Sequence, residues 1–134
     1  MAIIHTTQTR VRYGETDQMN TFYNAVALDW FEVGRNEALR STGRPYTQWE
    51  TDGIFLPVIE ARIFYKGRAN YDDLLDITAT LTLEGRARLR AAVTITRPDH
   101  DGASVAEGYT IHALANPAGR PVRPPQWVTD LFTN

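Results

Sequence analysis

The strongest constraint on the fold is strict alternation of apolar and polar residues over most of the second half of the chain. Residues 75–83 alternate without interruption, and residues 86–96 and 103–115 repeat the pattern. Residues 55–65 and about 5–13 alternate in the same way. Such alternation is typical of strands in a sheet with one covered face. We therefore predict five strands, the last four joined as a meander.

A long amphipathic helix is predicted over residues 23–42. Apolar residues recur there at helical spacing and form one stripe: Ala27, Trp30, Phe31, Gly34, Ala38 and Leu39. Gly34 costs about 1 kcal/mol of helix propensity relative to Ala, and close approach of the helix to a sheet would compensate. Shorter helices are expected at residues 45–52 and 126–132. The element order predicts an α+β fold in which a sheet curls around one long helix.

Length and composition are those of an ordinary globular protein. The 134 residues are 43% hydrophobic and 22% charged, and predict a single domain over residues 1–134. The absence of cysteine excludes disulfides and thiolate catalysis, and a net charge of -2 gives no indication of a nucleic-acid or membrane partner. The first residues lack the features of a signal peptide, so we expect a cytoplasmic protein.

Residues 11–25, with the sequence VRYGETDQMNTFYNA, join the first strand to the long helix and contain two carboxylates, Glu15 and Asp17. A helix N-terminus offers free N–H groups and a positive dipole end, which suit a carbonyl oxygen gaining negative charge. Asp17 would then lie close to that carbonyl. Capping of the helix by Asp17, Asn20 or Thr21 is the other interpretation, and spacing alone favours it.

Few other residues suggest chemistry. His5, His100 and His112 have no second metal ligand at a recognised spacing, so we expect no metal site, and we expect His112 on the outward face of the last strand. Nucleophile-elbow and phosphate-loop motifs are absent, which excludes serine-hydrolase and nucleotide functions. Glu60 could line a pocket, although a cross-strand pair with an arginine is its more ordinary use.

Three arginines lie at every second position of one predicted strand, about 7 Å apart: Arg86, Arg88 and Arg90. They fit a solvated strand face and a phosphate clamp about equally well.

The motif VRYGETDQM at residues 11–19, followed by Tyr23 and by WFEVGR at residues 30–35, resembles the hotdog-fold acyl-CoA thioesterases. The 4-hydroxybenzoyl-CoA thioesterase-like group is most similar. LPVIE at residues 56–60, YDD at 71–73 and GRP at 119–121 extend the resemblance from about residue 8 to 124. It implies the hotdog fold, a five-stranded antiparallel sheet wrapped around one long central helix. The implied reaction is hydrolysis of an acyl-CoA to a carboxylic acid and free coenzyme A.

The resemblance also implies roles for individual residues. Asp17 corresponds to the catalytic carboxylate, as nucleophile or general base, and the backbone amide of Asn24 to the oxyanion donor. The remaining substrate-binding candidates are Glu15, Tyr23 and Glu60 at the acyl site and Arg86, Arg88 and Arg90 at the coenzyme A phosphates. No cofactor is implied beyond the coenzyme A of the substrate. The implied assembly is a homodimer joined edge to edge, with active sites at its interface, often within a homotetramer.

The chain departs from the family pattern at four positions. Asn20 stands where the family usually has Gly, Asn24 where it often has His, and Val26 and Ala27 where it commonly has Asn and Tyr. Asn20 can adopt positive φ and Asn24 keeps its N–H, so we expect the turn and the oxyanion donor to be retained. Ala27 in place of a large aromatic residue predicts a different or roomier acyl pocket. Two alternatives stay open: a non-catalytic acyl-CoA or acyl-carrier binding protein, and a hotdog hydratase, which generally needs a His beside an acidic residue.

Overall fold

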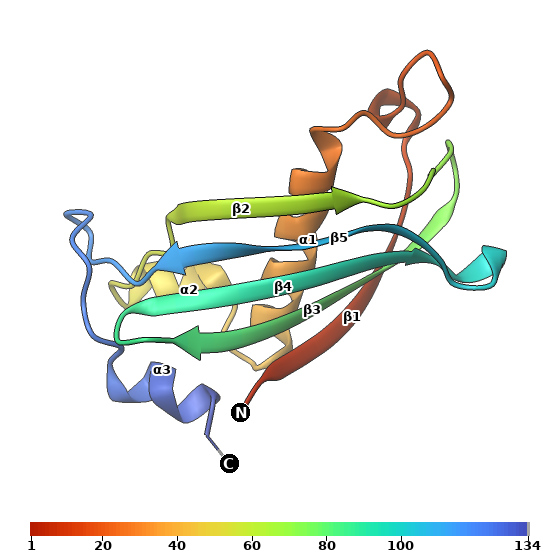
Figure 1. Cartoon of the computed structure of the whole chain (residues 1–134). Coiled ribbons are helices and arrows are strands. Elements are labelled where there is room, and N and C mark those ends of the chain that lie inside the picture. Colours follow the sequence, from red (N-terminus) through yellow and green to blue (C-terminus); the bar gives the residue numbers. More distant parts are fainter. Residues whose placement is uncertain (134) are drawn as a thin grey trace.

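The computed structural model describes residues 1–133, which form one curved sheet packed against a long helix (Figure 1). The elements are β1 (Ile3–Arg10), α1 (Val26–Ser41), α2 (Tyr46–Thr51), β2 (Val58–Tyr65), β3 (Leu74–Glu84), β4 (Arg88–Arg97), β5 (Ala103–Ala113) and α3 (Gln126–Leu131). All strand pairs are antiparallel, in the order β1-β3-β4-β5-β2. The predicted α+β architecture is confirmed. Among these residues, no helix is long and apolar enough to cross a membrane.

The predicted four-strand meander is wrong in one respect. Only β3, β4 and β5 follow one another in the sheet, whereas β2 lies at the far edge beside β5. Gly108 of β5 permits this pairing, because a Cβ there would lie 1.9 Å from the Arg62 carbonyl oxygen on β2. Alternation indicates which face of a strand is covered but not which strand is its neighbour.

The core forms between α1 and the inner face of the sheet. The six residues of the predicted helical stripe are all buried. A Cβ on Gly34 would lie 2.6 Å from Cγ2 of Ile77 on β3, so the expected close approach of helix and sheet is confirmed. At the open end of the core, α3 brings Trp127 against Trp49 of α2, with ring centroids 5.1 Å apart.

The prediction that His112 faces outward is wrong. Its side chain is fully buried, with Nδ1 2.9 Å from the Leu56 carbonyl oxygen and Nε2 2.8 Å from Thr110 Oγ1. A bulge causes the difference, because Ile95 pairs with Ala106 but Thr96 pairs with Ser104, which leaves Val105 as an extra residue. One extra residue exchanges the two faces of the rest of the strand.

Strand β2 is exposed on both faces, unlike the other strands of the sheet. Seven of its eight residues are exposed, including Val58 at 52% and Tyr65 at 49%. Helix α1 packs chiefly on β1 and β3, and Ile63 is the residue of β2 that is partly buried against the core. The edge of β2 and the surface beside α1 are therefore open.

Candidate active site

The segment between β1 and α1 forms a closed loop in front of the helix. Tyr13–Glu15 make a 3-10 turn, and a bridge between Thr16 and Phe22 closes the loop that Asp17 begins. Asn20 has φ of 63°, so the turn adopts the positive φ that was expected of it. Helix α1 starts after Ala25, whose side chain makes no cap bond, so the prediction that Asp17, Asn20 or Thr21 caps it is wrong.

Asp17 holds this loop together with one of its two carboxylate oxygens. Its Oδ1 accepts hydrogen bonds from the backbone N–H of Met19 at 2.8 Å and of Thr21 at 3.4 Å. Its own N–H donates to the Thr21 carbonyl at 2.8 Å. Within residues 1–133, Oδ2 accepts no hydrogen bond, so it is free to meet water or substrate.

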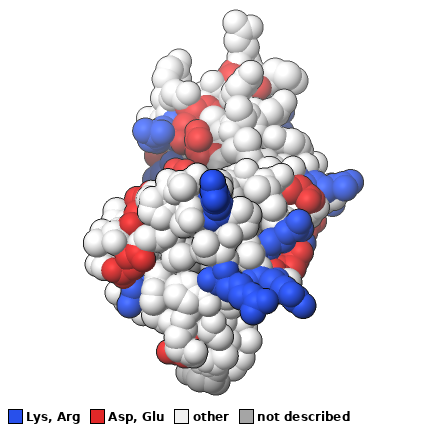
Figure 2. Space-filling view, turned by 90° about the vertical axis from the view of Figure 1, so that its left-hand side faces the viewer, with Lys and Arg blue, Asp and Glu red and all other residues white. Residues whose placement is uncertain are grey.

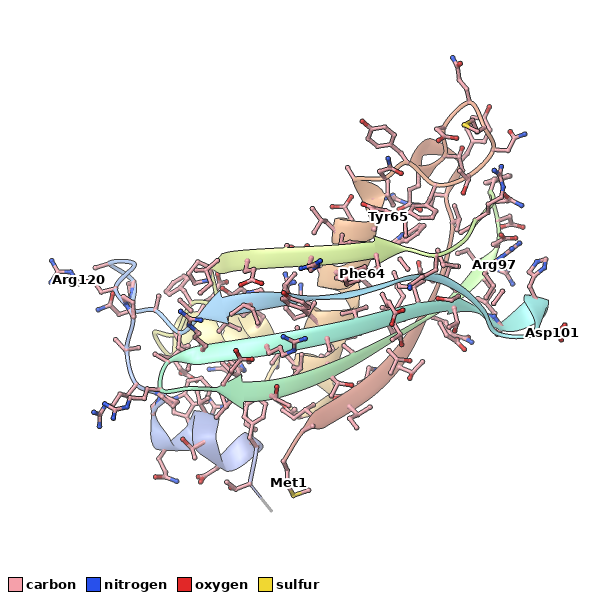
Figure 3. The ribbon with its side chains drawn as sticks, in the orientation of Figure 1. Met1, Phe64, Tyr65, Arg97, Asp101 and Arg120 are labelled. Carbon is pink, nitrogen blue, oxygen red and sulfur yellow. The ribbon has the colours of Figure 1, made fainter. Side chains whose placement is uncertain are left out.

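Asn24 presents a free backbone donor at the start of α1. Its N–H donates to no acceptor in the described part of the chain, while its carbonyl oxygen accepts the Tyr65 hydroxyl at 2.8 Å. Tyr65 lies at the end of β2 beside this loop (Figure 3) and stacks on Phe22, with centroids 6.1 Å apart. Local sequence patterns do not predict this role of Tyr65, because its partner is 41 residues away.

Glu15 is buried and serves the loop rather than an open pocket. Its Oε1 accepts the Arg12 N–H at 2.7 Å, and its Oε2 lies 3.3 Å from the Arg12 guanidinium. The Glu15 carbonyl oxygen accepts the N–H of Tyr23, whose side chain is 59% exposed. Glu15 thus fixes the position of the chain just before Asn24.

Glu60 lies on the sheet face opposite α1, away from Asp17. Its carboxylate accepts the Tyr109 hydroxyl at 2.6 Å, and the Arg90 guanidinium lies over the same tyrosine ring at 4.0 Å. Glu60 therefore forms a cross-strand pair, but its partner is Tyr109 and not the expected arginine. The same contact fixes Arg90 in the middle of the outer face.

The prediction that three arginines share one strand face is wrong for Arg86. Arg86 lies in the turn before β4, while Arg88 and Arg90 lie on the strand. Arg86, Arg123 and Pro124 line a hollow of about 400 Å³ at this end of the sheet. Figure 2, which views the molecule from this end, shows basic side chains gathered there. Arg123 was not a candidate, because residues 121–125 carry no recognisable motif.

The two candidate regions lie at opposite ends of the sheet. The Asp17 loop contacts the residues just before β3, through the Phe22 N–H and the Ala69 carbonyl oxygen at 2.9 Å. Arg86 follows the end of β3, and the 11 residues of this strand span about 35 Å. A single chain therefore does not bring Asp17 and the basic hollow together.

Over residues 11–132, a span that includes the Asp17 loop, α1 and strands β2 to β5, the sequence matches the thioesterase-like superfamily. The chain belongs to this family. YneP of Bacillus subtilis (strain 168), a proposed acyl-CoA thioesterase, is 34% identical over 109 residues, which are 81% of this chain and 65% of YneP. The chain thus spans slightly less than two thirds of that relative.

Solved structures confirm the hotdog fold. A DHNA-CoA thioesterase from Staphylococcus aureus is 25% identical with a TM-score of 0.85, over 95% of this chain and 85% of that one. The 4-hydroxybenzoyl-CoA thioesterase from Pseudomonas sp. strain CBS-3 is 22% identical with a TM-score of 0.81, over 96% and 98% of the two chains. The expected likeness to that group is thereby confirmed at the level of the family and the fold.

Proposed function

We propose that this protein is a thioesterase that hydrolyses an acyl-CoA to a carboxylic acid and free coenzyme A. One observation carries the proposal: a carboxylate with a free oxygen, Asp17, and an unpaired backbone N–H, Asn24, belong to the same junction before α1. A carboxylate and an oxyanion donor suffice for a thioester, because the thiolate is a good leaving group. Family membership supports the same reaction.

Asp17 Oδ2 acts on the thioester carbonyl carbon in one of two ways. It attacks directly, which expels the coenzyme A thiolate and leaves an anhydride that water hydrolyses, or it takes a proton from a water that attacks instead. In both routes the carbonyl oxygen becomes negative, and the Asn24 N–H stabilises it. The Tyr65 hydroxyl binds the Asn24 carbonyl oxygen, which belongs to the next peptide unit, and so holds Asn24 itself in place.

The phosphates of coenzyme A would bind at the basic hollow of Arg86 and Arg123, with Arg88 beside it and Arg90 farther along the sheet. A second protomer brings this hollow to the Asp17 loop. If the exposed edges of two β2 strands pair antiparallel, the Val58 end of one lies beside the Tyr65 end of the other. The partner's Arg86 then faces the Asp17 loop, so the proposed active unit is a homodimer, with a homotetramer as the larger assembly.

The test is hydrolysis of an acyl-CoA panel by Asp17→Asn. Asparagine keeps an oxygen to accept the Met19 and Thr21 N–H groups, so the loop is retained while the charge is lost. We expect kcat to fall at least 100-fold, the lower end for loss of a general base. Asp29→Asn, an exposed carboxylate in the first turn of α1, is the control. Unchanged turnover in Asp17→Asn would refute the mechanism.

A second test addresses the basic hollow. Arg86→Ala and Arg123→Ala should raise KM for acyl-CoA and leave kcat nearly unchanged, because they remove binding that is equal in the ground and transition states. Neither variant should alter hydrolysis of an acyl-pantetheine, which lacks the nucleotide. Arg90→Ala is the comparison, and an equal rise of KM there would place the phosphates on the sheet face instead.

The alternatives make different predictions. A binding protein would hold acyl-CoA tightly without turnover. A hydratase is disfavoured, because His112 is buried in two hydrogen bonds, and the polar contacts of His100 are with Arg97 and Asp73 rather than with Asp17.

A further inference from the structure

A chain of hydrogen bonds crosses the interior beside the middle of α1 and begins and ends at one small cavity. Arg35 Nη1 lies 3.5 Å from Thr110 Oγ1, whose hydroxyl lies 2.8 Å from His112 Nε2. His112 Nδ1 reaches the Leu56 carbonyl at 2.9 Å, and the Leu56 N–H donates to the Tyr46 hydroxyl oxygen at 3.0 Å.

In this series of hydrogen bonds, the groups at the two ends determine which atom donates and which accepts in every bond. A carbonyl oxygen only accepts, so His112 Nδ1 carries the proton and Nε2 accepts from Thr110. The Thr110 oxygen is then the acceptor for Arg35. At the other end, the Tyr46 oxygen accepts from Leu56, and its own proton meets no acceptor in residues 1–133. Both ends of this series of hydrogen bonds therefore present hydrogen-bond donors.

The cavity at these two ends has a volume of about 60 Å³ and is lined by Glu32, Arg35, Asn36, Leu39, Tyr46 and Leu56. The Arg35 side chain is only 12% exposed, and its other polar contact is Glu32 Oε1 at 3.7 Å, on a side chain that is 64% exposed. Such a solvated pair adds little. Most of the five guanidinium N–H donors thus lack a close acceptor, and burial lowers the pKa of Arg35.

We propose that this cavity, lined by Arg35 and Tyr46, binds a carboxylate group carried at the far end of the acyl chain. A carboxylate supplies acceptors for both the guanidinium and the tyrosine hydroxyl. This volume is several times the roughly 10–15 Å³ that a cavity needs to hold one water molecule, which gives room for a group of three heavy atoms. The inference rests on the proposed function, because it assigns the substrate class to the same active site.

The position of the cavity sets the length of the acyl chain. Arg35 follows Asn24 by 11 residues, which is about 16 Å along a helix. The surface between them borders the inner side of β2, where Val58, Ala61 and Tyr65 are exposed. An extended chain advances about 3.5 Å per three bonds, so the preferred acyl chain should have roughly 12 to 14 carbon atoms, with the thioester carbon and the distal carboxylate carbon included.

The experiment compares acyl-CoA substrates with ω-carboxyacyl-CoA substrates of equal length, from 6 to 16 carbons. The wild type should favour the ω-carboxy series by at least tenfold in kcat/KM near 12 to 14 carbons. Arg35→Lys should lose most of this ratio, because lysine lacks the fork that matches a carboxylate. Tyr46→Phe should lower it several-fold. Glu32→Gln should raise it, because a competing negative charge leaves the rim.

Glu37→Gln is the matched control, since Glu37 pairs with Arg40 at the same i,i+3 spacing but on an exposed part of α1. Its ratio should equal that of the wild type. An effect of Glu32→Gln opposite to that of Arg35→Lys is not expected from a purely structural network. A wild type without preference, or a ratio that Arg35→Lys leaves unchanged, overturns the proposal.

A binding measurement separates this inference from the proposed function. Dodecanedioate without coenzyme A should raise Tm of the wild type more than dodecanoate does, and Arg35→Lys should abolish the difference. If this holds while no thioester is hydrolysed, the proposed function fails and the carboxylate site stands. If hydrolysis occurs but neither ratio nor Tm distinguishes the carboxylate, the site fails and the proposed function stands.

Discussion

His112 makes the stability of this protein depend on pH in a way that can be calculated. Burial lowers the pKa of His112 to about 4, against an ordinary value of 6.5, with the nearby Arg35 acting in the same direction and the Leu56 carbonyl opposing it. The unfolded chain exposes the ring and restores its ordinary pKa. Between pH 6.5 and about 4, the unfolded state therefore binds a proton that the folded state does not.

The sign and size follow by linkage. Stability rises with pH wherever the unfolded state binds more protons, so the free energy of unfolding should fall as the pH drops from 6.5 toward 4. A shift of 2.5 units at 1.36 kcal/mol per unit corresponds to about 3 kcal/mol. That is a large part of the 5–15 kcal/mol typical of a folded protein.

The assay is urea unfolding of wild type and His112→Gln at a series of pH values. Glutamine can still donate to Leu56 but does not titrate, so the other groups of the protein cancel in the difference. The variant is expected to be less stable at pH 7, and the gap should narrow by about 3 kcal/mol as the pH falls to 4. Thr6→Val, which removes the exposed hydrogen bond between the Thr6 and Thr78 hydroxyls but no proton site, should show a constant gap. A constant gap in His112→Gln would refute the reasoning.

Two glycines give further predictions. Gly34→Ala should be destabilising by up to about 2 kcal/mol, because overpacking against Ile77 costs 1–3 kcal/mol and outweighs the gain in helix propensity; Gly14→Ala, which meets nothing within 4 Å, is the control. The double mutant of Gly34→Ala and Ile77→Ala lacks Cγ2 of Ile77, so it should be more stable than additivity predicts by at least 1 kcal/mol. Strict additivity would contradict the contact. Gly108→Ala should detach β2, because its Cβ would meet the carbonyl of Arg62. Hydrogen exchange should then show loss of protection in β2 before β3 and β4, and retained protection would contradict this.

Local periodicity predicted the elements well because it reflects which side of each element is covered. The stripe on α1 and the alternation of β3 both come from burial against the same core. The sequence pattern therefore predicts that residues such as Trp30 and Leu75 are buried. The first strand ends earlier than expected, at Arg10, because Glu15 caps a 3-10 turn that begins at Tyr13. The sequence pattern alone does not distinguish that turn from a strand end.

The predictions are wrong where a single residue changes which face of a strand is buried or how a strand edge pairs. The extra Val105 reverses the faces of β5 and moves His112 from the predicted surface into the core. Gly85 allows the positive φ of the turn that holds Arg86, and Gly108 allows β2 to pair with the edge of β5. Such effects depend on contacts between distant segments, so the residue pattern of a single strand does not predict them.

The open flank of β2 relates the separate parts of the proposed site to one another. At one end of this strand, Tyr65 holds the peptide of Asn24 beside the Asp17 loop, and at the other end Leu56 holds Tyr46 at the donor cavity. A substrate lying along this flank would place its thioester at the first end and its distal group at the second. Pairing of the same edge with a second protomer would cover the flank and supply the phosphate-binding hollow that one chain holds about 35 Å from Asp17. One exposed strand would therefore account for both the assembly of the site and the length of the acyl chain it selects.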